Sequence, residues 1–135
     1  MTLKQKPVLR VYRVLEIVQV TDGDSLWALL ERGLGTAGKR EIIERDYREG
    51  TNIRLDDGLL GLNTPEKRKD PVGWAAAKED LEAYFSTAAI HGGGFTFREY
   101  GEEGFGRTLG NFHPINGGLL DPVRYMINRG WASYK

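Results

Sequence analysis

A long stretch of β-branched residues that ends in an acidic turn limits the fold of this chain most strongly. Residues 8 to 20 include five valines and one isoleucine and alternate approximately between apolar and polar side chains, as β-strands do. Asp22-Gly23-Asp24 follows, and Asp and Gly tolerate the backbone geometry of a tight turn. Residues 25 to 31 then return as a second strand. The sequence therefore predicts a long hairpin with Asp24 at its mouth.

The segments after the hairpin complete a pattern of short strands with inserted helices. Residues 51 to 55, 95 to 100 and 107 to 112 have the character of strands. Two helices are predicted to start at Asp-Pro pairs, at residues 70 and 121, because Asp is a good N-cap and proline suits the first turn. This order favours an α+β, mainly β class and a small, partly open barrel of the OB type.

The length of the chain points to a single domain. With 135 residues it can bury one core, so residues 1–135 are expected to form one unit. Residues 1–7 are predicted to be a flexible N-terminus. Residues 33–50 are predicted to be an extended loop or hairpin insertion, with a short helix within 39–48 as the alternative. One face of the longer helix is expected to be buried; it comprises Trp74, Ala77, Leu81, Tyr84, Phe85 and Ala88.

Composition restricts the functional classes. Nineteen basic residues balance nineteen acidic ones, which argues against a nucleic-acid coat protein held by bulk charge but allows an enzyme with a locally basic cleft. Cysteine is absent, which excludes disulfides and thiolate chemistry. Neither a membrane-spanning run nor a signal peptide is seen. We expect a cytoplasmic monomer without membrane association; a phage or mobile-element protein in a bacterial host would suit this description.

Oxygen-bearing groups at two separate points of the chain predict a site for a hard cation. Asp24 offers a carboxylate, Asn63 an amide oxygen and Thr64 a backbone carbonyl, and Ca²⁺ prefers such ligands. Asp22 is a further carboxylate beside them. Each motif alone also has a simpler reading, since Asp-Gly-Asp is common in hairpin turns and Asn-Thr-Pro commonly ends a strand.

Other residues near these points suit phosphodiester hydrolysis. Such a reaction needs a group that takes a proton from water and positive charge on the phosphoryl oxygens. Glu66 is the candidate base, and Arg107 and Arg54 are candidate phosphate clamps, because a guanidinium binds phosphate through two hydrogen bonds. Lys67 and Arg68 are candidate substrate-binding residues, although a short basic run is also typical of a solvated loop.

The motifs occur in a fixed order along most of the chain, from about Val11 onward. They are Asp22-Gly23-Asp24-Ser25, Arg54-Leu55, Asn63-Thr64-Pro65-Glu66, Phe105-Gly106-Arg107-Thr108-Leu109 and Arg129-Gly130-Trp131-Ala132. This set resembles the pattern of the staphylococcal nuclease (thermonuclease) family. The resemblance implies a five-stranded OB barrel with two or three packed helices and a Ca²⁺-dependent endonuclease or exonuclease activity on DNA, with RNA as a further substrate.

The resemblance also implies a role for each matching residue. Asp24 would be the calcium carboxylate and Thr64 the carbonyl ligand, with Asp22 flanking the metal. Glu66 would activate water, and Arg107 would hold the phosphate. By the same resemblance Arg54 would be the second arginine.

Three departures from the family pattern accompany the match. Asn63 stands where the family has a second calcium carboxylate, which predicts weaker or altered metal binding, including a preference for another divalent cation. Arg54 precedes Asn63 by nine positions where the family has five, so residues 56–59 look inserted. Phe105 replaces a tyrosine; it can stack on a base or ribose but cannot donate a hydrogen bond. Tyr134 is a second candidate for stacking, with docking of the C-terminal tail as its alternative.

These departures leave a second function open. A nuclease fold that has lost catalysis could serve as a nucleic-acid or protein binding module. Asn63 and Phe105 favour this alternative, whereas the joint presence of Asp24, Glu66 and Arg107 favours the enzyme.

Overall fold

The computed structural model describes residues 5–32, 41–42, 50–59, 62–104 and 106–131. None of the helices in these ranges is long and apolar enough to cross a membrane. In chain order the elements are β1 (Arg10–Asp22), β2 (Ser25–Arg32), β3 (Glu41–Ile42), β4 (Thr51–Leu55), α1 (Pro71–His91), β5 (Phe95–Glu102), β6 (Thr108–Pro114) and α2 (Pro122–Asn128).

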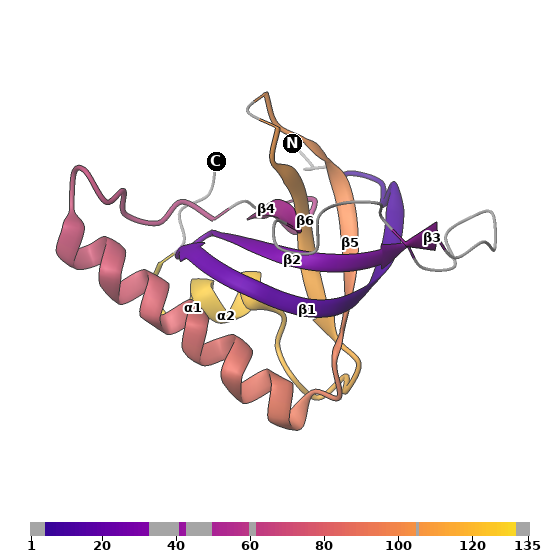
Figure 1. The fold of residues 1–135 in the computed structure, drawn as a ribbon. Helices are drawn as coiled ribbons and strands as arrows, with labels where there is room; N and C mark the ends of the chain where they lie inside the picture. Colours follow the sequence, from indigo (N-terminus) through magenta and orange to yellow (C-terminus); the bar gives the residue numbers. More distant parts are fainter. Residues whose placement is uncertain (1–4, 33–40, 43–49, 60–61, 105, 132–135) are drawn as a thin grey trace.

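Five of the strands close into a barrel. They follow the order β1-β5-β6-β4-β2, and β2 pairs back onto β1. The pairing of β4 with β6 is parallel and the other barrel pairings are antiparallel. The two-residue strand β3 pairs with the end of β2 outside this ring. The predicted OB-type, mainly β architecture is therefore confirmed, with α1 and α2 lying on one side of the barrel (Figure 1).

The opening hairpin forms as predicted, because its pattern of alternating side chains continues up to the turn. β1 pairs with β2 along its length, down to the pair Asp22 and Ser25, and with β5 only near its start. Its pairing with β2 shifts register at three points. Such irregularities bend a strand and increase its twist, so β1 can leave β5 and follow β2 around the barrel.

Helix α1 closes the barrel with the face that the sequence predicted. Its buried residues are Ala77, Leu81, Tyr84, Phe85 and Ala88, which pack into the core with barrel residues such as Phe97 and Phe112. Trp74, which was expected in this buried face, is only partly buried. The helix ends at His91, and Gly92 is its C-cap.

Both Asp-Pro pairs start helices, as predicted. The Asp70 Oδ1 atom accepts a hydrogen bond from the Gly73 backbone N–H, and the Asp121 Oδ1 atom accepts one from Arg124 N–H, each at 2.9 Å. These bonds satisfy amides that a helix start would otherwise leave unpaired.

Two predicted irregular segments are described only in part. In the segment predicted as a flexible N-terminus, the Gln5 side chain donates to the Asp57 carbonyl and the Lys6 backbone N–H donates to the Gly58 carbonyl. Residues 1–4 lie outside the described residues. Of the predicted insertion at 33–50, the described part is β3 and Gly50.

Gly23 sits where the hairpin turn packs closely against α1. A Cβ atom at this position would lie 2.6 Å from the Ala77 Cβ and 3.0 Å from the Thr64 Cγ2. Both neighbours are short side chains that cannot move aside. The turn can therefore pack this closely against α1 because Gly23 has no side chain.

We expect Gly23→Ala to lower the free energy of unfolding by about 1–3 kcal/mol, the usual cost of forcing an extra methyl group into a packed interior. Urea denaturation of the two proteins measures the difference. Gly117→Ala is the matched control, because an added Cβ there meets no atom within 4 Å. Equal unfolding midpoints for Gly23→Ala and the unmodified protein would contradict this account of the turn.

Candidate active site

A pocket of about 230 Å³ opens where the hairpin turn, the corner after β4 and the approach to β6 meet. Its lining includes all seven residues predicted to bind metal or to act in catalysis. They are Asp22, Asp24, Arg54, Asn63, Thr64, Glu66 and Arg107, and Pro65 and Lys67 complete the lining. The structure thus brings together residues from three parts of the chain that are far apart in sequence.

Strand pairing explains why the two arginines and the acidic turn meet. Ser25, at the start of β2, pairs with Arg54 on β4, and Arg54 in turn pairs with Leu109 near the start of β6. The Leu55 backbone N–H also donates to the Asp24 carbonyl at 2.8 Å. Because three neighbouring strands contribute at one end of the barrel, Asp24, Arg54 and Arg107 lie side by side.

The corner after β4 brings the third group of residues. Leu62 is fully buried and anchors the corner in the core, and Thr64 is buried beside Gly23. Asn63 and Glu66 are exposed and line the pocket. The Glu66 side chain pairs with Lys69 Nζ at 3.7 Å, an exposed contact of little energetic value.

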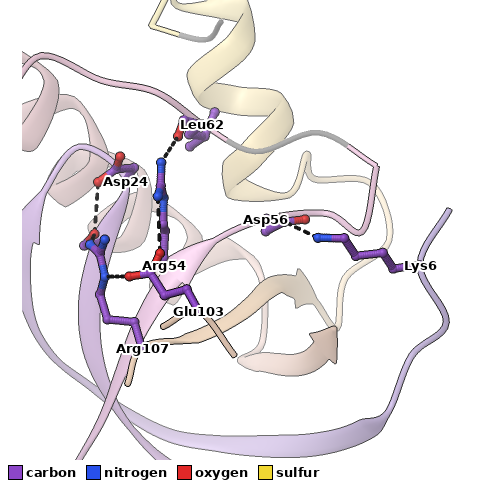
Figure 2. Close-up of polar contacts among 8 residues, drawn as sticks. Lys6, Asp24, Arg54, Asp56, Leu62, Glu103 and Arg107 are labelled. Atoms are coloured by element: carbon purple, nitrogen blue, oxygen red, sulfur yellow. Dashed lines mark hydrogen bonds and ion pairs between the residues drawn. The ribbon is translucent and has the colours of Figure 1, made fainter. Parts of the chain in front are cut away.

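Residues 56–59, which look inserted against the family pattern, follow β4 in a turn outside the pocket. The Asp56 Oδ1 atom accepts a hydrogen bond from the Gly58 N–H at 2.7 Å, and Gly58 has a φ of 86°, which glycine adopts without strain. Lys6 Nζ lies 3.6 Å from the other Asp56 oxygen, well away from the arginines (Figure 2). Arg54 consequently keeps its place in the pocket despite its altered spacing from Asn63.

The acidic side of the pocket consists of two carboxylates held by hydrogen bonds. The Ser25 hydroxyl donates to Asp24 Oδ1 at 2.9 Å, and the Trp74 indole N–H donates to Asp22 Oδ1 at 2.6 Å. Burial raises the pKa of Asp24, and the hydrogen bond from Ser25 and the nearby positive charge of Arg54 only partly oppose this rise.

The oxygen atoms on this side of the pocket are of the kind that binds a hard cation. A bound cation would favour the ionised Asp24 that burial disfavours. Asp22 and Asp24, the Asn63 amide oxygen and the Thr64 carbonyl provide oxygen ligands of the kind that Ca²⁺ prefers. Among the described residues, no three acidic, histidine or cysteine side chains form a metal-ligand cluster by themselves. A cation here would therefore depend on the amide and the carbonyl as well as on the carboxylates.

The basic side of the pocket is organised by Glu103, which the sequence reasoning did not select. Its Oε1 atom accepts a hydrogen bond from Arg107 Nε, and its Oε2 atom lies 3.3 Å from Arg54 Nη1 (Figure 2). Burial acts to raise the pKa of Glu103, but the hydrogen bonds and charges of Arg107 and Arg54 outweigh it and lower the pKa overall. Glu103 is therefore an ionised partner for both guanidinium groups.

The predicted substrate-binding residues divide into three cases. Lys67 lines the pocket, and its Nζ lies 4.7 Å from the centre of the Trp74 ring. Arg68 is exposed and is not part of the lining. Phe105 and Tyr134 lie outside the described residues, so their predicted stacking roles stay predictions.

Comparisons with known proteins add no family assignment. No model of a known protein family matches the chain, and no curated protein sequence matches it either. The motif resemblance and the arrangement of side chains in the pocket are therefore the basis for a proposed function.

Proposed function

We propose that the protein is a Ca²⁺-dependent nuclease of the thermonuclease type, which hydrolyses phosphodiester bonds in DNA and, as a second substrate to be tested, in RNA. The observation that supports it best is the composition of the pocket described above. Acidic and amide oxygens line it together with two guanidinium groups and an exposed carboxylate, Glu66. A phosphodiester anion, an attacking water and a divalent cation require these three kinds of partner.

Each group has a role in this proposal. Asp24, Asn63 and the Thr64 carbonyl would hold Ca²⁺ with Asp22 beside them, and the bound ion would supply Lewis-acid polarisation of a phosphoryl oxygen. Arg107 and Arg54 are set to bind non-bridging oxygens, because their positive charge offsets the negative charge that grows on the phosphoryl group.

Glu66 is the proposed general base. Its carboxylate lines the pocket and is exposed, so water can reach it. It would accept a proton from the water whose oxygen attacks phosphorus, while the bond from phosphorus to the leaving oxygen breaks and that oxygen takes up a proton from solvent to leave as a hydroxyl group. Lys69, its ion-pair partner, is also exposed and would not prevent this proton transfer.

Nicking of supercoiled plasmid DNA tests the proposal directly. We expect the purified protein to convert supercoiled to nicked DNA with Ca²⁺ and to lose this activity when a chelator is added. Parallel reactions with Mg²⁺ and other divalent ions establish which cation the site prefers. Absence of divalent-dependent cleavage of both DNA and RNA would reject the nuclease assignment.

A second candidate is a binding module that retains the fold without catalysis. Asn63 favours it, because the missing carboxylate leaves the cation side with less negative charge. Retained binding of a DNA oligonucleotide together with absence of cleavage at every divalent ion tested would support this alternative over the enzyme.

Restoring a carboxylate at Asn63 is expected to strengthen cation binding. Asn63 lines the same pocket as Asp22 and Asp24, so Asn63→Asp adds a third negative charge close to the proposed ion. We expect the affinity for Ca²⁺ to rise by roughly tenfold, since each charged ligand at a few ångströms contributes on the order of 1 kcal/mol or more. Isothermal titration calorimetry measures the change. Asn128→Asp, on the exposed end of α2, is the control; a similar gain in both variants would argue against a specific site.

A further inference from the structure

Glu103 is placed to act on both arginines at once. Its two carboxylate oxygens are divided between them, with Oε1 facing Arg107 Nε and Oε2 facing Arg54 Nη1. The Glu103 side chain is only 15% exposed, and those of Arg54 and Arg107 are 18% and 26% exposed. Contacts shielded in this way are screened less by salt and water than surface ion pairs are.

Each guanidinium also donates a hydrogen bond through a second nitrogen to a different acceptor. Arg107 Nη1 donates to the Ser25 hydroxyl oxygen at 2.9 Å, and Arg54 Nη2 donates to the Leu62 carbonyl at 3.3 Å. Ser25 in turn donates to Asp24. A guanidinium held at two of its nitrogens cannot rotate freely, so these contacts fix the plane of each arginine (Figure 2).

The arrangement leaves donors for a ligand. The hydrogen bonds of Arg107 in the described part of the chain use Nε and Nη1, which leaves Nη2 available for a phosphate oxygen. Arg54 Nη1 and Nη2 each carry a second N–H besides the one given to Glu103 or Leu62, whereas Arg54 Nε is buried and does not face a ligand. Glu103 therefore accepts a hydrogen bond from one nitrogen of each guanidinium and leaves other N–H groups of both arginines for a ligand.

We propose that Glu103 is a positioning residue, which holds Arg54 and Arg107 at a fixed spacing so that one phosphate group meets both guanidinium groups. This inference rests on the proposed function. Without the shared carboxylate, two neighbouring positive charges repel each other and their long side chains regain rotational freedom. A phosphate would then have to order both side chains, which raises the cost of reaching the transition state.

Three variants test the proposal. Glu103→Gln removes the charge at nearly constant size, Glu103→Asp keeps the charge on a shorter side chain, and Glu102→Gln is a control on the exposed neighbouring glutamate. We expect Glu103→Gln to lower kcat by about tenfold to a hundredfold with a smaller change in KM, as misplacement of catalytic groups does. Glu103→Asp should recover part of the loss, and Glu102→Gln should behave as the unmodified protein does.

Two further measurements separate positioning from a general structural role. The Nε–H signal of Arg107 in ¹H–¹⁵N NMR spectra should be visible in the unmodified protein and should move or disappear in Glu103→Gln, while urea unfolding keeps a similar midpoint. Binding of a nucleoside 3′,5′-bisphosphate in the presence of Ca²⁺, measured by calorimetry, should weaken by about tenfold in Glu103→Gln, the effect of losing roughly 1.4 kcal/mol of interaction.

The outcomes distinguish this inference from the proposed function. If the unmodified protein cleaves DNA and Glu103→Gln does so at the same rate, positioning by Glu103 is rejected and the nuclease assignment stands. Faster cleavage or tighter bisphosphate binding by Glu103→Gln also rejects it, because the carboxylate would then be a competitor of phosphate. If the unmodified protein does not cleave DNA, bisphosphate binding tests the inference. Weaker binding by Glu103→Gln than by the unmodified protein supports positioning by Glu103. Equal binding by the two proteins, or no binding by either, overturns it.

Discussion

Glu66→Gln is expected to lower the rate of DNA cleavage by about two to four orders of magnitude, the usual contribution of a general base. The amide has nearly the same size as the carboxylate but cannot accept the proton of the attacking water. Folding should be unaffected, because the Glu66 side chain is 67% exposed and its ion pair with Lys69 is exposed as well. Initial rates with Ca²⁺ and a defined DNA duplex measure the effect.

The exposed glutamate Glu79 on α1 provides the matched control for this substitution. Glu79→Gln makes the same chemical change away from the pocket and should leave the rate within a factor of about two, as surface substitutions normally do. A Glu66→Gln protein that keeps more than one tenth of the rate would remove Glu66 from the role of general base.

Arg107→Ala is expected to lower kcat by about a hundredfold to a thousandfold, similar to the removal of other groups that stabilise transition-state charge. The variant loses the proposed phosphate contact, and it also removes one of the two partners of Glu103 and the donor to Ser25. Arg107→Lys should restore little activity, because an ammonium cannot reproduce the planar pair of donors. Single-turnover cleavage rates at saturating protein measure both effects.

Arg124 serves as the control for the loss of a positive charge. It is exposed on α2, and Arg124→Ala should cleave DNA at nearly the unmodified rate. If Arg107→Ala changes only the affinity for DNA and leaves kcat intact, Arg107 contributes general electrostatic attraction and does not stabilise the transition state.

The sequence predicted those parts of the fold that depend on local chemistry. The hairpin around Asp22-Gly23-Asp24 and the helix starts at Asp70 and Asp121 were predictable, because turn residues and N-caps act within a few positions. The barrel was predictable as a class from the order of short strands and helices. Its closure depends on pairings between distant strands, which only the structure reveals.

The contact of Glu103 with the two arginines could not be predicted from the sequence. Glu102 and Glu103 are adjacent, and the sequence does not indicate which of them faces the arginines. The difference arises from backbone geometry: the pairing of β5 with β6 shifts register after Glu99 and ends at the pair Glu102 and Thr108. Glu103 then lies in the loop, where its N–H donates to the Arg107 carbonyl at 3.0 Å.

Trp74 shows a conflict between local pattern and tertiary structure. Helical spacing predicted it in the core, but the hairpin turn brings the Asp22 carboxylate within hydrogen-bond distance of its indole nitrogen. A half-buried ring with a polar edge suits this position better than a fully buried one. The spacing of Arg54 and Asn63 is a similar case, because the chain between them turns at Asp56 and Gly58 and both residues line the same pocket.

The parallel pairing of β4 with β6 has a consequence for the order in which the pocket can form during synthesis. Arg107 arrives with the last strand of the ring, after the whole of α1 has been made. A ribosome-bound chain that stops at the end of β5 holds both turn carboxylates and Glu66 but neither Glu103 nor Arg107. The two arginines of the proposed phosphate site are therefore present together only after the chain has been extended past β5.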